Sequence, residues 1–353
     1  MPDISVLVLS RYDKDGASSR VRILQYLPWC SQQGIKFTVS PLLPPHYIAR
    51  LYQSGKRNYL AIAWAYLRRL LLLLRSNKYD VVWIEKEIWP FVPAWVEKIF
   101  YKNWSRTILD YDDAIFLNYT KHRYGIVKWL LGNKIANIMG SADIVTVGNA
   151  YLKDYAEACG ARDVRFLPSV VDIEKYHVRT DEAQDVFRIG WIGSPATRNY
   201  LESMSKVLKT LGSEHKIILV TIGLDDFYIN GVEVKSVKWS EASEAKELRS
   251  LDIGIMPLFQ TEWEKGKCAY KLIQYMACGL PVVATRFGAN SKVVEQGKEG
   301  FLVDDDDEWI GAIKQLIENK KLYREMSLCA RANVEESYTI QRQQNVFLSL
   351  FQP

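Results

Sequence analysis

Residues 263–285 read WEKGKCAYKLIQYMACGLPVVAT, and they predict a loop, a helix and a strand in immediate succession. The helix is expected from about Ala269 to Ala277, because Gly279-Leu280-Pro281 provides a stop signal directly after it. Val282-Val283-Ala284 then forms a short apolar strand. A helix that feeds directly into a buried strand is typical of α/β folds with a parallel sheet.

The same alternation extends in both directions from this block. Strands are predicted at residues 4–10, 36–39, 80–84, 106–109 and 143–147, and a second series at 188–192, 216–222, 232–237, 253–256 and 281–284. A length of 353 residues suits two such series. The sequence therefore predicts two doubly wound, Rossmann-like α/β domains that face each other across a cleft. We expect them at residues 1–168 and 169–337, with a final helix at about 338–353 that packs back on the first.

The composition is that of an ordinary globular protein, with 48% apolar and 25% charged residues. The five cysteines are scattered and never spaced as Cys-x-x-Cys, and the four histidines form no metal-binding spacing. This usage favours a reducing, cytoplasmic location and predicts no metal. Met1-Pro2-Asp3 runs straight into the first strand, so no signal peptide is expected.

Positive charge is concentrated in the first half of the chain. Residues 1–168 hold 23 Lys and Arg against 14 Asp and Glu, whereas residues 169–353 hold 23 against 27. A basic first domain suits an anionic partner, either phospholipid headgroups at the inner face of the membrane or a lipid-linked pyrophosphate acceptor. Nucleic acid is not expected, because no nucleic-acid-binding signature is present.

Residues 59–75, YLAIAWAYLRRLLLLLR, are the most lipophilic stretch. They are too short for a membrane span, which needs about 20 apolar residues, and arginines interrupt them. Two interpretations remain open. The stretch forms either a core helix of the first domain or a helix that lies on a membrane surface with Trp64 and Tyr66 at the interface.

Ligands of open α/β sheets bind beyond the carboxyl ends of the strands, so the loops there carry the candidate site residues. In the second domain, small residues and cations before helices predict a phosphate site, because helix N-termini attract anions. The alternative is that these residues only form ordinary turns and bind no phosphate. The candidate donor-binding residues are Gly193, Ser194, Arg198, Gly266, Lys267, Cys268, Lys271 and Gln274.

The first domain offers a small-residue loop and two groups of acids after its strands. Gly16, Ser18, Ser19, Arg20 and Arg22 are candidates for binding an acceptor. Glu87, Asp112 and Asp113 are candidates for catalysis, because acids clustered at strand ends can orient or deprotonate an acceptor hydroxyl. Flexible turns and ordinary helix N-caps are the alternatives. Asp110-Tyr111-Asp112 also imitates an Asp-x-Asp metal clamp, but the phosphate-like loops lie in the other domain.

Gln274-Tyr275-Met276-Ala277-Cys278-Gly279-Leu280-Pro281-Val282-Val283, followed by Glu299-Gly300-Phe301-Leu302-Val303, resembles the signature of the group 1 (family 4) glycosyltransferases. Weaker similarity in YDVVWIEKE, DYDDAIF and SADIVTVGNAYL extends the resemblance over nearly the whole chain. The resemblance implies the GT-B fold and transfer, with retention, from a nucleoside-diphosphate sugar to a glycan or lipid-linked acceptor in cell-surface polysaccharide biosynthesis. It implies no cofactor.

The chain departs from that signature at two positions. Gln274 stands where the family has its second glutamate, and Gly266 stands eight positions earlier, where the first is expected. Glu262 or Glu264 could replace the missing carboxylate from a shifted loop. Two other functions therefore stay open: a catalytically inactive sugar-nucleotide-binding subunit, and a sugar-nucleotide 2-epimerase.

Overall fold

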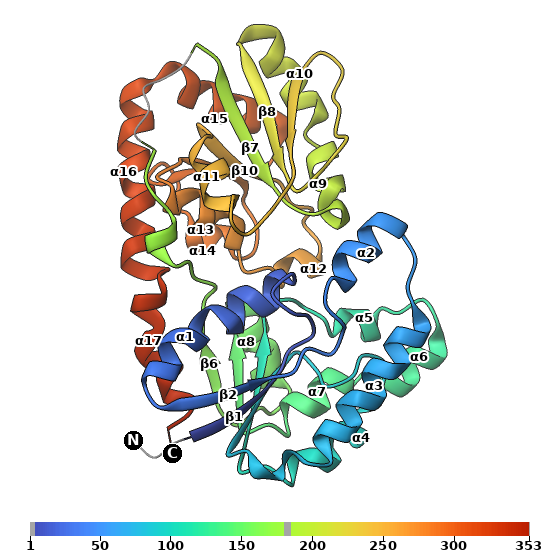
Figure 1. Ribbon diagram of the computed structural model, residues 1–353. Helices are drawn as coiled ribbons and strands as arrows, with labels where there is room; N and C mark the ends of the chain where they lie inside the picture. The colour runs from blue at the N-terminus through green and yellow to red at the C-terminus, as the bar shows by residue number, and fades with distance from the viewer. Residues whose placement is uncertain (1–3, 180–184, 353) are drawn as a thin grey trace. The chain divides into compact units, whose positions relative to one another are not determined.

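The structure, a computed structural model, describes residues 4–179 and 185–352, and its contacts divide the chain into two compact units. Unit 1 comprises Met1–Ser169, Gly266–Cys268 and Gln343–Pro353, and unit 2 comprises Val170–Lys265 and Ala269–Arg342. Figure 1 shows the elements of both units. The chain start on which the signal-peptide expectation rests, Met1-Pro2-Asp3, lies outside the described residues.

Unit 1 is built on a six-stranded parallel sheet with the order β2-β1-β3-β4-β5-β6. Its strands are short and rich in Val and Ile, as expected for strands buried on both faces. They are β1 (Ile4–Leu9), β2 (Ile35–Val39), β3 (Val81–Glu85), β4 (Arg106–Tyr111), β5 (Ile144–Val147) and β6 (Val164–Phe166).

Helices cover both faces of this sheet (Figure 1). The α-helices are α1 (Leu27–Gln32), α2 (Tyr47–Ser54), α3 (Tyr59–Leu73), α4 (Ala94–Tyr101), α5 (Leu117–Thr120), α6 (Gly125–Leu131), α7 (Lys134–Met139) and α8 (Ala150–Ala158). The short helices are η1 (Ser19–Ile23), η2 (Leu24–Tyr26) and η3 (Ser76–Lys78). The segment from Ser19 to Gln32 is thus divided into a π turn, a 3₁₀ turn and α1.

The two faces of sheet 1 have separate cores. On one face, strand residues such as Val82 and Ile84 join a cluster with inner residues of α3, α4, α7 and α8. On the other face, the Phe347 ring stacks on Tyr26 at 3.9 Å and meets Trp83 edge-on at 5.0 Å. Phe347 belongs to α17 (Ile340–Ser349), so these rings anchor the last residues of the chain to unit 1.

Unit 2 repeats the plan with a parallel sheet of order β12-β11-β10-β7-β8-β9. Its strands are β7 (Phe187–Ile192), β8 (Ile217–Ile222), β9 (Glu233–Val237), β10 (Ile253–Met256), β11 (Val282–Thr285) and β12 (Gly300–Val303). Its helices are η4 (Ile173–Lys175), η5 (Pro195–Thr197), α9 (Arg198–Glu202), α10 (Ser205–Glu214), α11 (Glu244–Arg249), α12 (Glu262–Lys265), α13 (Tyr270–Ala277), α14 (Asn290–Val293), α15 (Asp306–Glu318) and α16 (Lys320–Ser337).

A glycine in the centre of sheet 2 allows α13 to lie close to β10. A Cβ atom at Gly254 would stand 2.1 Å from the Tyr275 ring, so no other residue fits there without moving that helix. The Tyr275 hydroxyl in turn accepts a hydrogen bond from the Ile192 amide at 2.8 Å. Close packing at Tyr275 therefore fixes α13 against β10 and the end of β7.

The predicted fold class, two Rossmann-like α/β units, is confirmed by the two parallel sheets. The sequence analysis missed β6 and β12, which are short strands of three and four residues at the edges of their sheets. In the part of the chain that the structure describes, no helix has both the length and the apolarity that a membrane span requires.

Candidate functional site

At the carboxyl end of β7 in unit 2, three of the predicted donor-binding residues come together. The Nζ atom of Lys271 lies 4.6 Å from the centre of the Trp191 ring. The same ring borders Gly193, where a Cβ atom would stand 2.2 Å from it. Ser194 follows, and its amide donates to Thr197 Oγ1 at 3.2 Å. A cation held over an aromatic face, beside a loop that only glycine permits, suits an anionic ligand.

Arg198 has its described contacts elsewhere. Its Nε donates to Glu202 Oε1 at 2.8 Å, and its guanidinium lies 5.4 Å from the Phe227 ring centre. Because both Arg198 and Glu202 are exposed, this ion pair contributes little to stability, so the guanidinium can turn toward a ligand at small cost.

Gln274 lies in the interior of unit 2, only 2% exposed, and this corrects the expectation that it faces a ribose hydroxyl. Its Nε2 donates to Glu244 Oε1 at 2.7 Å and to the Tyr176 hydroxyl at 3.0 Å. Glu244 also accepts from Tyr176 at 2.8 Å and from Trp239 Nε1 at 2.6 Å. The amide nitrogen of Gln274 therefore serves a buried network around the Glu244 carboxylate, since a buried carboxylate requires donors.

The two glutamates considered as substitutes lie on α12 and differ in environment. Glu264 is 4% exposed and accepts hydrogen bonds from the hydroxyls of Tyr200 and Thr261. Glu262 is exposed. Glu264 thus acts in the packing of α12, whereas the carboxylate of Glu262 is at the surface of unit 2.

The loop Gly266–Cys268 belongs to unit 1, although the sequence analysis placed it in the second domain. A Cβ atom at Gly266 would stand 2.5 Å from the backbone of Ala114, which explains why this position is glycine. The Cys268 thiol donates to the carbonyl oxygen of Asp112 at 3.2 Å, and Asn149 Nδ2 donates to the Lys267 carbonyl at 3.0 Å. The chain following β4 thus holds this loop through backbone contacts that the sequence does not reveal.

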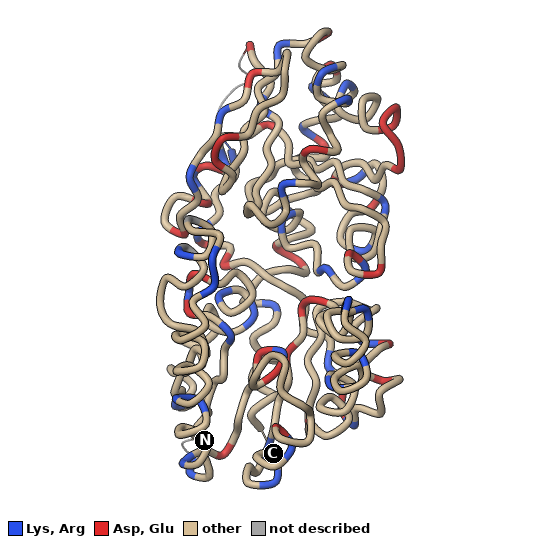
Figure 2. Tube along the Cα trace, turned by 90° about the vertical axis from the view of Figure 1, so that its right-hand side faces the viewer, with Lys and Arg blue, Asp and Glu red and all other residues tan. Residues whose placement is uncertain are grey.

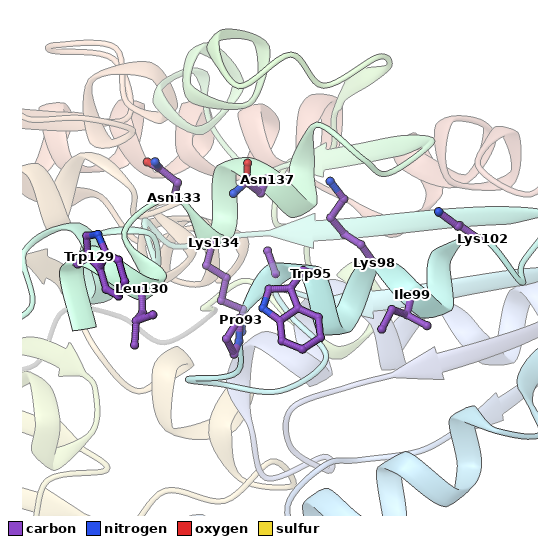
Figure 3. A pocket seen from close by; sticks show the side chains of 11 residues that line it. Pro93, Trp95, Lys98, Ile99, Lys102, Trp129, Leu130, Asn133, Lys134 and Asn137 are labelled. Carbon is purple, nitrogen blue, oxygen red and sulfur yellow. The ribbon is translucent and has the colours of Figure 1, made fainter. Parts of the chain in front are cut away.

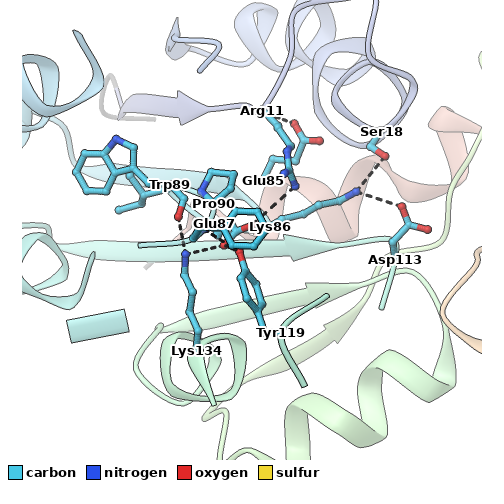
Figure 4. Close-up of polar contacts among 12 residues, drawn as sticks. Arg11, Ser18, Glu85, Lys86, Glu87, Trp89, Pro90, Asp113, Tyr119 and Lys134 are labelled. Carbon is cyan, nitrogen blue, oxygen red and sulfur yellow. Dashed lines mark hydrogen bonds and ion pairs between the residues drawn. The ribbon is translucent and has the colours of Figure 1, made fainter. Parts of the chain in front are cut away.

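At the carboxyl edge of sheet 1, Lys86 lies between the two predicted catalytic aspartates. Figure 4 shows its contacts with Asp113 and Ser18. Its Nζ lies 2.9 Å from Asp112 Oδ1, 3.2 Å from Asp113 Oδ2 and 3.3 Å from Ser18 Oγ. Lys86 is 7% exposed, and its backbone has a φ of +68°, a left-handed conformation that non-glycine residues rarely adopt. Strained backbone of this kind is concentrated at functional sites.

The pKa values of the two aspartates in this cluster are shifted in opposite directions. Burial by itself would raise the pKa of Asp112, but Lys86 and Arg22 hold it below its ordinary value. Burial and the neighbouring Asp112 charge raise the pKa of Asp113, and Lys86 only partly opposes them. Two adjacent carboxyls with pKa values pushed apart are the arrangement that assigns one to charge stabilisation and the other to proton transfer.

Two predicted acceptor-binding residues, Arg22 and Ser19, point into unit 1 instead. Arg22 is 1% exposed and forms a two-pronged ion pair with Asp110, at 2.7 and 3.0 Å. Burial would lower the pKa of Arg22, but Asp110 raises it above its ordinary value. Ser19 donates to Glu85 Oε2 at 2.6 Å. Both residues therefore satisfy buried carboxylates, and the expectation that they contact an acceptor is corrected.

The remaining residues of the small-residue loop have different environments. A Cβ atom at Gly16 would stand 2.6 Å from Tyr12 Cβ, so this glycine permits the turn. Arg20 Nη1 donates to the carbonyl of Lys14 at 3.0 Å, within the same loop. Ser18 contacts the Lys86 cluster, and it is partly buried.

Glu87 is also a structural residue, contrary to its predicted catalytic role. It is 6% exposed, accepts from the Tyr119 hydroxyl at 2.7 Å and forms an ion pair with Lys134 at 2.6 Å (Figure 4). Lys134 also pairs with the fully buried Glu97 at 2.9 Å. A cation between two buried carboxylates offsets the cost of burying them, so Glu87 is committed to the core.

Lys86 is the residue that sequence reasoning missed. It stands between two acids in Glu85-Lys86-Glu87, directly after a strand, and that position was the available signal. Within residues 4–179 and 185–352, no three His, Cys, Asp or Glu side chains are grouped as metal ligands would be.

The match to a protein family lies almost entirely in unit 2. Residues 186–319 match the family model described as glycosyl transferases group 1. Residues 186–319 belong to the group 1 glycosyltransferase family. This group 1 segment contains the Gly193 loop, Lys271 and the buried Gln274.

Curated relatives resemble this chain over short stretches. D-inositol 3-phosphate glycosyltransferase of Paenarthrobacter aurescens is 32% identical over 93 residues, which are 26% of this chain and 22% of that protein. N-acetyl-alpha-D-glucosaminyl L-malate synthase of Bacillus anthracis is 34% identical over 77 residues, 21% of this chain and 20% of that protein. The matched stretch therefore spans about a fifth of each relative.

Solved structures resemble this chain over nearly its full length. Anabaena HepE, in complex with UDP and glucose, has a TM-score of 0.68 at 14% identity and covers 99% of this chain and 100% of that one. Sucrose-phosphate synthase from Thermosynechococcus elongatus has a TM-score of 0.70 at 13% identity, with 99% of each chain covered. At these identities the similarity shows the fold, which is that of GT-B glycosyltransferases.

Proposed function

We propose that this protein is a retaining glycosyltransferase that moves a sugar from a nucleoside-diphosphate sugar to a hydroxyl group of a glycan or lipid-linked acceptor, in cell-surface polysaccharide biosynthesis on the cytoplasmic side of the membrane. The observation that carries the proposal is the grouping of Lys271, Trp191 and Gly193 at the carboxyl end of β7 in a group 1 glycosyltransferase segment. The presence of UDP and glucose in the related fold of HepE supports a nucleotide-sugar donor.

In this proposal, the backbone amides after Gly193 and the ammonium group of Lys271 bind the donor diphosphate. The bond between the anomeric carbon and the diphosphate oxygen breaks, and a bond from that carbon to the acceptor oxygen forms. Negative charge grows on the leaving diphosphate, and fixed donors that already point at it lower the barrier. These groups take the place that a divalent cation has in metal-dependent transferases, so activity should survive treatment with EDTA.

The acceptor loses one proton during the transfer, and two groups can receive it. One is an oxygen of the leaving diphosphate. The other is Asp113, whose side chain is 28% exposed and whose pKa is raised by burial and by Asp112. Lys86 holds both aspartates in place, so we assign Asp112 to orientation and Asp113 to contact with the acceptor hydroxyl.

A thermal-shift screen against sugar nucleotides of UDP, GDP, ADP and TDP tests the donor site. A ligand that binds the folded state raises its melting temperature, so one nucleotide series should stabilise the protein selectively. Lys271→Ala should reduce that shift strongly, whereas Lys292→Ala, an exposed lysine of the same unit, should leave it unchanged. Equal shifts in the two variants would refute the assignment of the donor site to the end of β7.

A catalytically inactive sugar-nucleotide-binding subunit is the second candidate, because Gln274 and Gly266 replace the two family glutamates. The two functions differ in nucleoside-diphosphate release with a panel of donors and acceptors. Release that requires an acceptor supports the transferase, and binding without release supports the inactive subunit. A sugar-nucleotide 2-epimerase, the third candidate, would convert its donor with no acceptor present.

A further inference from the structure

Helix α3 carries apolar residues on two sides, because Leu73 and its neighbours pack in the core and a second stripe lies at the surface. The second stripe faces outward: Leu60 is 85% exposed, Trp64 64%, Leu67 44%, Leu71 52% and Leu74 66%. These residues repeat at intervals of three and four, so they share one side of the helix. Exposing such a stripe to water is unfavourable, and monomeric proteins rarely present one without a partner for it.

The inward side of α3 explains this orientation. Arg69 is 2% exposed, and its Nη2 donates to the carbonyls of Ser10 at 3.0 Å and Ser40 at 2.7 Å. Arg68 Nη2 donates to the Pro41 carbonyl at 2.7 Å. The arginines thus attach α3 to the ends of β1 and β2, and the leucines are left on the outside. Both interpretations of residues 59–75 therefore stay open: Leu73 belongs to the core cluster and Ile62 and Tyr66 pack against it, while another side of α3 is exposed.

A second apolar surface lies on the same side of sheet 1. Helices α4 and α6 flank a groove of about 480 Å³ (Figure 3). Trp95 is 67% exposed, Ile99 54%, Trp129 79% and Leu130 55%. Inner residues of α3, α4 and α6 all join one core cluster, so the three helices cover the same face of the sheet. We call their outer surface the α3–α4–α6 face.

The charge around this face has one sign. Residues 16–79 and 114–142 contain no Asp or Glu. The exposed charged residues of α2, α3 and α6 and of the segments beside them are all basic: Arg50, Lys56, Arg57, Arg68, Arg75, Lys78, Lys121, Arg123 and Lys128. On α4, Lys98 and Lys102 line the groove, and the single acid of that helix, Glu97, is fully buried. Figure 2 marks these charges and views the molecule from the side on which Figure 1 shows α3 and α6.

We propose that the α3–α4–α6 face docks on the surface of an anionic phospholipid bilayer. Exposed tryptophans and leucines enter the interface between headgroups and acyl chains, and the surrounding lysines and arginines attract the anionic headgroups. Charge distinguishes this occupant from a second copy of the chain, because a symmetric dimer through this face would place the basic residues of each copy near those of the other. The inference does not depend on which sugar or acceptor the protein uses.

Co-sedimentation of the full chain with lipid vesicles tests the proposal. The protein should bind vesicles of phosphatidylcholine with phosphatidylglycerol, bind weakly to phosphatidylcholine alone, and dissociate as salt is added. Trp95→Ala with Trp129→Ala, and separately Leu67→Gln with Leu71→Gln, should each weaken binding by about tenfold or more, because each pair removes large apolar side chains from the interface.

Two exposed apolar residues of unit 2 supply matched controls. Tyr228 is 74% exposed and Leu328 is 73% exposed, so Tyr228→Ala and Leu328→Gln remove similar surface elsewhere and should leave vesicle binding unchanged. Wild-type protein that stays in the supernatant with anionic vesicles would overturn the proposal. So would equal losses in the control variants, or a wild-type dimer in light scattering that Leu67→Gln dissociates. Retention of the nucleotide thermal shift in the face variants keeps this result separate from the proposed function.

Discussion

Replacing Lys86 by methionine should destabilise unit 1 in a way that depends on pH. The substitution keeps an unbranched chain only one atom shorter but removes the charge that lies 2.9 Å from Asp112 and 3.2 Å from Asp113. Both aspartates then stand together in a half-buried site without their cation. We expect the pKa of each to rise, because a carboxylate loses its attraction to Lys86 and keeps its repulsion from the other carboxylate.

The expected loss is about 3 kcal/mol at neutral pH. Two charges 4 Å apart near a protein surface interact by about 4 kcal/mol, and removing one member of a buried pair costs about 3–5 kcal/mol. The lower end applies here, because the side chains of Asp112 and Asp113 are 14% and 28% exposed and water can partly solvate them. A loss of about 3 kcal/mol is a large fraction of the free energy of unfolding of a typical domain, which is about 5–15 kcal/mol.

The sign of the pH dependence follows from the pKa directions. The pKa of wild-type Asp112 is depressed, so its stabilising contribution is present above about pH 4 and is lost as the pH falls through its folded-state value. In the variant, the raised carboxyl pKa values mean that the ionised aspartates destabilise the folded state at neutral pH. Protonation at acid pH relieves the repulsion between the two carboxylates. The difference between wild type and variant should therefore be largest near about pH 7 and shrink toward about pH 4.

Urea denaturation at a series of pH values measures this difference, and hydrogen exchange of peptides from β3 and β4 assigns it to unit 1. Lys153→Met is the control, because Lys153 forms an exposed ion pair with Glu157, and such pairs contribute about 0.5 kcal/mol or less. A loss in the Lys86 variant that matches the control, or that stays constant from acid to neutral pH, would refute the reasoning that Lys86 acts through its charge.

Three further predictions concern both units. Phe347→Ala should cost unit 1 about 3–5 kcal/mol, measured by urea denaturation, because the fully buried ring packs on Tyr26 and Trp83 and its loss leaves a cavity. Glu244→Gln should lower the melting temperature, and adding Gln274→Glu should restore part of it, since the exchange returns one carboxylate and one amide to the buried network; an additive loss would contradict this. Lys271→Ala should reduce the sugar-nucleotide thermal shift far more than Asp112→Ala, and equal reductions would contradict the assignment of Lys271 to the donor and Asp112 to the acceptor.

Parts of the site were predictable because they depend on local sequence. Gly193 and Lys271 were found from the rule that ligands bind beyond strand ends, before helices, and the structure brings them together around Trp191. Asp112 and Asp113 were found by the same rule. Lys86 was not, because its importance comes from a left-handed backbone turn that directs its side chain onto residues of another strand end.

Other residues were predicted to bind ligands, although in the structure their side chains bind buried partners within the protein. Arg22, Ser19, Glu87 and Gln274 are polar residues near strand ends, and sequence alone gives no sign that each meets a buried partner. Their partners, such as Asp110 for Arg22, are far away along the chain. Whether a polar side chain faces a ligand or a buried counter-charge is decided by such long-range contacts.

The sequence by itself determined the alternation of strands and helices, the division into two α/β units and the positions of the loops that carry the site, because periodicity, glycines and helix stops act over a few residues. Only the tertiary structure decided which polar groups are buried and which way α3 faces. Arg69 bonds to backbone carbonyls at two strand ends and Leu73 packs in the core, and these long-range contacts leave a second stripe of leucines at the surface.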